Sequence, residues 1–243
     1  MRRFAFLLVM FLALAPVAAR AQLVADLSKH LVAITTGFAG TDVLLFGAVD
    51  GPGDVVVVVR GPVRSETVRR KARAALIWVN SGEVEFQAPS FYMVGSTRPL
   101  VEIANDSLRA RHEIGVDHVR IEHQSKLAPA DLADYRKALI RLKQKRGLYG
   151  AEVLPVTSLG GRLFRSELHF PANVPVGTYQ VEVFLIANGE VVSAQTTPLL
   201  ISKIGVGAEV YDFAHENGAI YGIIAILLAV SAGYIAAVVF KKG

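Results

Sequence analysis

The feature that most constrains this chain is an uncharged apolar run close to its C-terminus. Ala219–Phe240 contains 22 residues and no charged side chain. As an α-helix rising about 1.5 Å per residue, the run would be about 33 Å long, enough to cross the ~30 Å hydrocarbon core of a bilayer. Lys241 and Lys242 follow it directly, and the positive-inside rule places such residues on the cytoplasmic side. The run therefore predicts a single-pass membrane protein with most of its chain on the opposite side.

The N-terminal segment carries a second membrane-targeting signal. Residues 1–21 begin with Met1 and the pair Arg2 and Arg3, followed by an apolar run from Phe4 to Ala15 and a small-x-small cleavage motif that ends at Ala21. The apolar run would extend only about 18 Å as a helix, which favours a cleaved signal peptide over a retained N-terminal anchor. We therefore expect export, a mature chain that begins near Gln22, and an inner-membrane protein whose bulk lies in the periplasm.

Charge and composition exclude several functional classes. The formal net charge is +5, and the excess lies in the two terminal segments, at Arg2, Arg3, Arg20, Lys241 and Lys242. The excess of basic residues therefore indicates how the chain is oriented in the membrane, and we expect no nucleic-acid partner. The chain has no cysteine, which excludes thiol catalysis, thiolate metal sites and disulfides. Sequence motifs of serine hydrolases, zinc proteases, P-loop proteins and EF hands are also missing. We expect neither an enzyme nor a bound cofactor.

The region that follows the signal is rich in short strands bounded by turn residues. The valines Val55–Val59 stand between glycine-proline pairs, and Phe164–Phe170 alternates apolar with polar residues as a half-buried strand does. Asn188-Gly189 between two apolar runs predicts a hairpin. Further strands are expected at Leu31–Phe38, Val43–Val49, Ala75–Val79, Val84–Ala88, Phe91–Val94 and Tyr179–Leu185, with Asn80-Ser81-Gly82 as the turn between the third and the fourth of these.

The periodicity becomes helical around residues 98–147. Pro129 at the first turn and Gly147 as a stop predict a helix over 129–146. Its expected apolar face is Leu132, Tyr135, Leu139 and Leu142, and its basic end, with Lys143, complements the helix dipole. A second helix is expected from Pro99 to about Glu113.

Strands, then helices, then strands predict a mainly β fold. We expect an immunoglobulin-like β-sandwich over residues 22–207, with the helical segment inserted in it. Helical spacing of Val210 and Phe213 suggests that the membrane helix begins near Ala208 and covers residues 208–240, leaving 241–243 as a cytoplasmic tail.

Three histidines lie in one short polar segment. His112, His118 and His123 accompany several carboxylates, and both groups are ligands for zinc or copper. If residues 117–123 form a strand, His118 and His123 lie on opposite faces and the three rings do not easily converge. The alternative is a solvated, charged sheet edge.

Two further groups of residues are candidate binding sites. Arg69, Arg70 and Arg73 form a basic run together with Lys71. The run suits phosphate, sulfate, or an anionic lipid or protein surface, and the alternative is a charged edge strand. Small residues recur every four positions in the apolar run and would let another helix approach closely, either from an integral membrane protein or from a second copy. The alternative is the ordinary composition of membrane helices. These small residues are Ala225, Ala229, Gly233 and Ala237.

Several segments taken together resemble one known family. They are VAITTGF at 32–38, LFG at 45–47, VVVRGP at 57–62, IWVN at 77–80, STRPL at 96–100, FPANVPVGTY at 170–179 and YDFAH at 211–215. With the two terminal signals, they resemble an alphaproteobacterial family of single-span transmembrane proteins. The resemblance implies an envelope protein with an N-terminal signal and a C-terminal anchor, and it implies no catalytic residue.

The sequence thus leads to one main functional hypothesis. We expect a membrane-anchored accessory or interaction module that partners an envelope membrane protein, because catalytic motifs are missing and the span carries a small-residue face. The alternatives are a metal-binding protein or metal-dependent enzyme that uses the three histidines, and an anion-binding sensor that uses the three arginines.

The signal at the N-terminus makes a direct prediction about processing. The mature protein should begin near Gln22, because the small-x-small motif ends at Ala21. Mass spectrometry of protein purified from membranes measures this directly. Intact Met1 in the membrane fraction would contradict cleavage.

Overall fold

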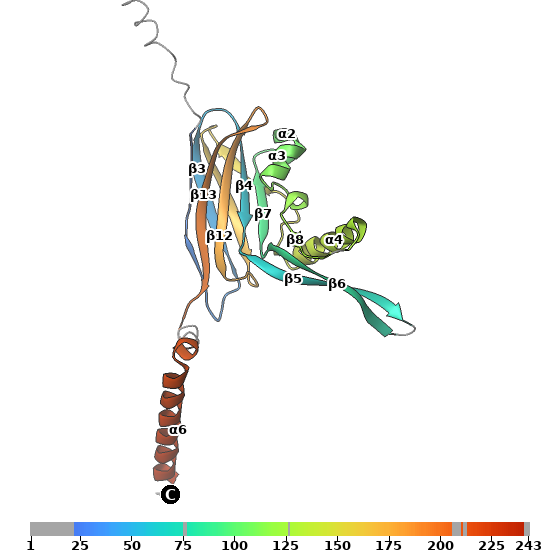
Figure 1. Ribbon diagram of the computed structural model, residues 1–243. Helices are drawn as coiled ribbons and strands as arrows, with labels where there is room; N and C mark the ends of the chain where they lie inside the picture. Colours follow the sequence, from blue (N-terminus) through green and yellow to red (C-terminus); the bar gives the residue numbers. More distant parts are fainter. Residues whose placement is uncertain (1–21, 75–76, 126, 206–209, 211–212, 241–243) are drawn as a thin grey trace, which may run out of the picture.

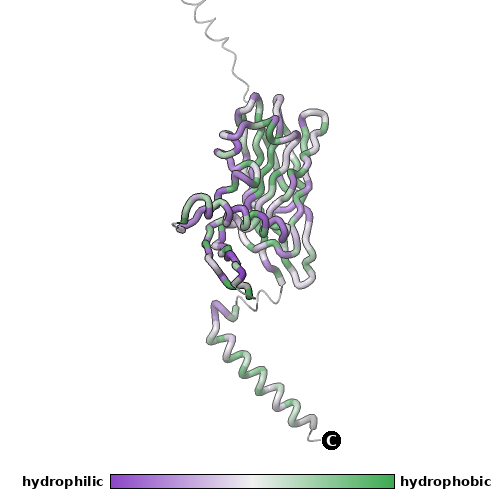
Figure 2. The backbone as a smooth tube through the Cα atoms, turned by 90° about the vertical axis from the view of Figure 1, so that its right-hand side faces the viewer, coloured by the Kyte–Doolittle hydropathy of each residue, from purple (hydrophilic) through white to green (hydrophobic). Residues whose placement is uncertain are grey.

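A computed structural model describes residues 22–74, 77–125, 127–205, 210 and 213–240. The chain is mainly β, with one long apolar helix at its C-terminal end (Figure 1). Both features confirm the sequence prediction. Apolar residues run through the centre of the β-rich part, and polar residues lie mostly around it (Figure 2).

Two sheets pack face to face, and together they are called the sandwich below (Figure 1). The first sheet has the order β1 (Gln22–Leu27), β3 (Gly40–Asp50), β11 (Leu163–Pro171) and β10 (Thr157–Leu159), all antiparallel. The second has the order β2 (Leu31–Ile34), β13 (Glu190–Lys203), β12 (Gly177–Ala187), β4 (Asp54–Arg60), β7 (Tyr92–Ser96) and β9 (Leu154–Pro155). In this sheet β2 runs parallel to β13, and β9 runs parallel to β7.

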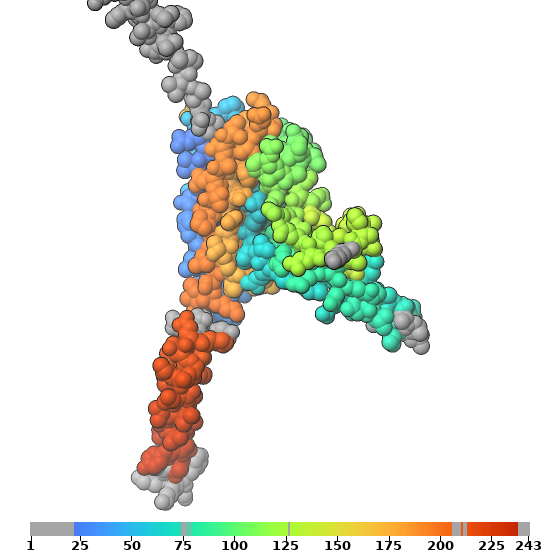
Figure 3. All heavy atoms as spheres, in the orientation of Figure 1, coloured from blue at the N-terminus to red at the C-terminus, as the bar shows by residue number. Residues whose placement is uncertain are grey.

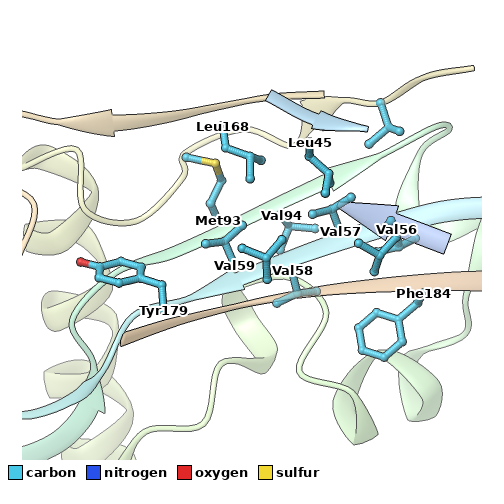
Figure 4. Packing of buried hydrophobic residues seen from close by; sticks show 14 of the residues in the cluster. Leu45, Val56, Val57, Val58, Val59, Met93, Val94, Leu168, Tyr179 and Phe184 are labelled. Carbon is cyan, nitrogen blue, oxygen red and sulfur yellow. The ribbon is translucent and has the colours of Figure 1, made fainter. Parts of the chain in front are cut away.

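Strand β4 lies at the centre of the core. Its residues Val55–Val59 are all buried, so both faces of the strand are covered. Leu45 and Leu168 of the first sheet lie over one face, and Phe184 lies on the other side (Figure 4). A continuous apolar run is what such a two-sided position requires. Strand β11, by contrast, buries only alternate residues, as its alternating sequence predicts.

The helical segment differs in part from expectation. The single helix expected from Pro99 to Glu113 is wrong: α2 (Leu100–Ile103) and α3 (Asp106–Arg111) are separate. Ala104 and Asn105 divide them: the extended backbone of Ala104 ends α2, and the Asn105 side chain accepts a hydrogen bond from Leu108 N at 2.8 Å and caps α3. Residues 117–123 do not form one strand, since a 3-10 turn at Val116–His118 precedes the two-residue β8 (Glu122–His123). Helix α4 (Pro129–Lys145) confirms its prediction.

A long hairpin projects from the sandwich and is called the arm below (Figure 3). It consists of β5 (Val63–Ala74) and β6 (Ile77–Pro89), and β8 adds two pairs to β6. The turn expected at Asn80-Ser81-Gly82 is wrong, because these residues lie inside β6. They form a bulge, in which Ser81 is the extra residue between the pairs that Asn80 and Gly82 make with β5. Polar turn residues suit a bulge equally well, since a turn and a bulge both interrupt the hydrogen-bond ladder between the strands.

Helix α4 lies across the arm and gives it a small core of its own. Two of its residues, Tyr135 and Leu139, are buried against the arm; its strand partners are Val68, Val84, Phe86 and Ala88. Leu142, which the sequence pattern places on the apolar face, is 45% exposed. Lys143 takes the inward position in its place.

The arm leaves the sandwich at the end from which the chain continues towards the C-terminal helix α6 (Gly218–Phe240). Arg60 at the end of β4 pairs with Gln180, which pairs with Pro198 near the end of β13. The β12–β13 turn lies at the opposite end. There Asn188 and Gly189 have φ values of +53° and +76°, as an Asn-Gly hairpin turn requires. Figures 1 and 2 show the arm and α6 towards the same end.

Helix α6 is the one helix of the described chain that is long and apolar enough to cross a membrane, and none of its apolar window is buried. The expected start near Ala208 lies outside the described residues. Residues 213–216 are helical, and Asn217 separates them from α6.

Gly47 of β3 offers a test of the packing of the first sheet. A Cβ at this position would lie 2.5 Å from Phe164 Cζ and closer still to Val24 O. Because the backbone oxygen cannot move away, Gly47→Ala should lower the free energy of unfolding by about 1–3 kcal/mol. Chemical denaturation in detergent measures this. Gly37→Ala is the control, since its Cβ would meet nothing within 4 Å; equal destabilisation by both changes would contradict the packing.

Candidate functional site

One arginine joins the sandwich to the segments at the root of the arm. Arg60 Nη1 donates to Glu182 Oε2 at 2.7 Å, and Nη2 donates to the carbonyl of His112 at 2.8 Å. Its Nε lies 3.3 Å from Glu113 Oε2. The three side chains are largely buried, so the two carboxylates balance the guanidinium where water screens it poorly.

Tyr92 holds the backbone next to this arginine. Its hydroxyl donates to Glu113 O at 2.5 Å and accepts from Gly115 N at 2.9 Å. These two bonds fix a segment in which Glu113 and Gly115 both have positive φ. Burial raises the pKa of the Tyr92 hydroxyl, so it stays a donor. These bonds therefore join the sandwich to the segment that follows α3.

The arm and α4 are joined by a second charged pair. Lys143 is only 3% exposed, and its ammonium contacts Glu66 of β5, which is 27% exposed. The ammonium also lies 6.0 Å from the centre of the Tyr149 ring. A buried ammonium needs such a partner, because the charge would otherwise be desolvated without compensation. From the sequence, Lys143 is expected to complement the helix dipole, because no local sequence pattern indicates that its side chain faces inward.

The predicted arginines lie along β5 at the edge of an open groove of about 540 Å³ between the arm and α4. Arg69 pairs with Glu83 at 3.0 Å, while Arg70 lies 3.3 Å from Asp134 and 5.2 Å from the centre of the Tyr135 ring. Arg73 lies further along β5. Lys71 of the same run also lines the groove, and the structure adds two further cations, Lys137 and Arg141. Lys137 and Arg141 come from α4, and sequence reasoning missed them because only the packing of α4 brings them beside β5.

A second groove, called the distal groove below, lies at the opposite end of the sandwich, beside the Asn188-Gly189 turn. It has a volume of about 550 Å³. Asp54 and Arg98 form a two-pronged pair in its wall, with Nε 2.9 Å from Oδ1 and Nη2 on Oδ2. The bonds from Arg98, with one from Thr97, hold the pKa of Asp54 below its usual value. No sequence motif marks this groove, because its walls come from separate loops.

The three histidines have different surroundings. The His112 ring packs on Phe184 with centroids 5.2 Å apart, and the His118 Nε2 lies 3.3 Å from Asp106 Oδ1. The His123 ring meets the edge of Phe86. Within the described residues, no group of three or more His, Asp or Glu side chains is arranged to hold a metal ion. Metal binding by these histidines stays a prediction that this arrangement does not favour.

The small-residue face of the span lies on the surface of α6. Ala225, Ala229, Gly233 and Ala237 are all exposed, and a Cβ on Gly233 would meet nothing within 4 Å. The Ser231 hydroxyl is used within the helix, where it donates to Leu227 O at 2.7 Å. The face is therefore open to another helix.

Comparison with known proteins places the chain in a family. The family model described as "Putative transmembrane protein (Alph_Pro_TM)" matches residues 22–242. The chain belongs to this family. The match confirms the resemblance found in the sequence and, with the one candidate span among the described residues, membrane localisation. No curated protein and no solved structure matches the chain.

In this Alph_Pro_TM member, the Lys143–Glu66 pair predicts an asymmetry between two substitutions. Glu66→Gln leaves a buried ammonium without its carboxylate and should destabilise the arm and α4 by about 3 kcal/mol. Lys143→Met should cost less, because water reaches Glu66 and methionine suits the buried position. Hydrogen exchange of α4 amides measures both.

The double variant Glu66→Gln/Lys143→Met is the control. It should exchange more slowly than Glu66→Gln alone, since it leaves no buried charge. Faster exchange in the double variant than in either single variant would show that the pair does not act as described.

Proposed function

We propose that this protein is a membrane-anchored interaction module of the periplasm, with an immunoglobulin-like domain that binds an envelope membrane protein. The observation that carries the proposal is the placement of the distal groove and the span at opposite ends of the domain. The span holds one end at the bilayer, and the distal groove faces away from it. Such an arrangement suits a tethered receptor or accessory subunit.

Strand order supports the immunoglobulin-like assignment. The first sheet, β1-β3-β11-β10, corresponds to the A-B-E-D sheet of these domains, and β13-β12-β4-β7 corresponds to G-F-C-C′. The Tyr179 hydroxyl, near the start of β12, donates to Pro175 O at 2.6 Å. A tyrosine at the start of strand F that bonds to the backbone a few residues upstream is the tyrosine corner of this fold. Val181 occupies the position of the second disulfide cysteine, and it is fully buried.

The loops around the distal groove support a binding role. They are the β3–β4 turn with Gly53, the β12–β13 turn with Asn188, and the segment after β7 with Arg98. In variable-type immunoglobulin domains, the B–C and F–G loops at this end form the recognition surface together with the loop that follows C′. Asp54, Arg98 and Glu102 line the distal groove, so the surface suits a polar segment of a partner protein.

The exposed face of α6 supports a partner within the membrane. Small side chains let two helix backbones approach closely, which is how helices associate in lipid. The partner is an integral membrane protein, or a second copy of this chain in a homodimer. No catalytic role is proposed.

Substitution in the span tests the proposal. Gly233→Leu should abolish crosslinking to the partner while preserving membrane insertion, because it adds bulk to the contact face and makes the helix more apolar. The measurement is crosslinking in intact membranes followed by mass spectrometry of the co-purified chain, at matched protein levels.

Ser231→Leu is the matched control for this experiment. At ~100° per residue, Ser231 lies opposite the centre of the small-residue face, so added bulk there should leave crosslinking intact. Equal crosslinking by Gly233→Leu and wild type would remove the span from the interface. Recovery of only uncrosslinked monomer from wild type would count against the whole proposal.

A further inference from the structure

We propose that the arm binds the anionic phospholipid surface of the membrane that α6 spans, with headgroup phosphates in the basic groove between β5 and α4. This goes beyond the proposed function, which concerns a partner protein. The inference rests on the charges of the groove, the apolar side chains at the outer end of the arm, and the position of the arm near the anchor.

The groove has an excess of positive charge that the protein does not neutralise. Arg69 and Arg70 have carboxylate partners in Glu83 and Asp134. Among the residues that the structure describes, Lys71, Lys137 and Arg141 have none, although all three line the same groove and are exposed. Two elements far apart in sequence thus present cations to one open space. Such a cluster attracts phosphate groups, and the openness of the groove suits headgroups in a surface.

The outer end of the arm adds an apolar contribution. Ile77 is 65% exposed and Val79 is 37% exposed; both lie on β6 beyond the bulge at Ser81. The small core between the arm and α4 ends before these residues, since its outermost arm residues are Val68 and Val84. A two-stranded ribbon without a covering layer is marginally stable in water. Apolar side chains beside a basic groove are the combination that enters a membrane interface, where the apolar groups leave water and the cations meet phosphates.

The arm begins at the end of the sandwich from which the chain continues to the span. Arg60, just before β5, is in register with Gln180, whose neighbour on β13 is Pro198. Strand β5 has 12 residues and is therefore about 40 Å long. The anchor keeps the arm close to the bilayer, so a weak affinity for lipid suffices. This tether favours lipid headgroups over free phosphate as the occupant.

A fluorescence experiment on the full chain tests the inference. The chain has no cysteine, so Ile77→Cys gives a single site for an environment-sensitive dye. The labelled protein is placed in nanodiscs of phosphatidylcholine alone, or of phosphatidylcholine mixed with phosphatidylglycerol, with brominated acyl chains as quenchers. We expect quenching in the anionic nanodiscs and much less in the neutral ones. Val101→Cys, which is 72% exposed in wild type and lines the distal groove, should show none.

Removing the unpaired cations should abolish the effect. Lys71→Ala/Lys137→Ala/Arg141→Ala should lower the partition of the arm into anionic nanodiscs about a hundredfold, at roughly fivefold per cation. Arg111→Ala/Arg162→Ala/Arg165→Ala removes the same charge from exposed positions on the sandwich and α3, and it should change little. Hydrogen exchange of α4 confirms that each variant keeps the arm folded. Added salt should weaken quenching of the wild type.

Three results would overturn the inference. They are equal quenching in neutral and anionic nanodiscs, equal loss in the two triple variants, and release of the arm by inorganic phosphate beyond the effect of chloride at matched ionic strength. The last result would assign the groove to free phosphate. No partner protein enters this measurement, so a negative result leaves the proposed function standing. Conversely, failure of wild type to crosslink to a partner would count against the proposed function and would not affect the inference about lipid.

Discussion

The structure depends on the burial of β4 on both of its faces. Val56–Val59 have no exposed surface, and burying each valine contributes about 1.5–3 kcal/mol before the cost of ordering the chain. The first sheet covers one face. The other face needs a second cover, and Ile103, Ile114 and Val119 of the helical segment belong to the same core. The segment between β7 and β10 therefore completes the core of the sandwich, and it also carries α4 to the arm.

The arm is stabilised in a different way. Its core is small, and the ion pair of Lys143 with Glu66 supplements it by joining α4 to β5. Next to the arm, Arg60 with Glu182 and Glu113 joins the sandwich to the segment that follows α3. Removing one member of such a pair leaves a poorly solvated charge, so each pair favours a single arrangement of the elements. An inner part held by α4 and an exposed outer end suit a surface element that contacts something outside the domain.

Much of the fold is predictable because it depends on local patterns. Alternation in β11, the Asn-Gly turn at 188–189 and the Pro129 start of α4 are all confirmed, since each depends on backbone preferences of a few residues. The errors have a common cause. Asn80-Ser81-Gly82 suits a turn or a bulge, and only the length of the paired strand decides between them. Asn105 suits a helix interior less well than a cap, and here it caps the start of α3 directly after the extended Ala104 that ends α2, so one expected helix becomes two.

The candidate sites also differ in how far they can be predicted from local sequence patterns. Sequence reasoning finds Arg69, Arg70 and Arg73 because they are adjacent in the chain, and it misses Lys137 and Arg141, which join them only through the packing of α4. It groups His112, His118 and His123 as one candidate metal site, whereas in the structure each of the three rings has a different neighbour. By itself, the sequence determined the membrane anchor, the β-rich class and most strand positions, because hydropathy and turn preferences act over short distances. Only the tertiary structure decided the two grooves and the inward position of Lys143, because these depend on contacts between residues far apart in the chain.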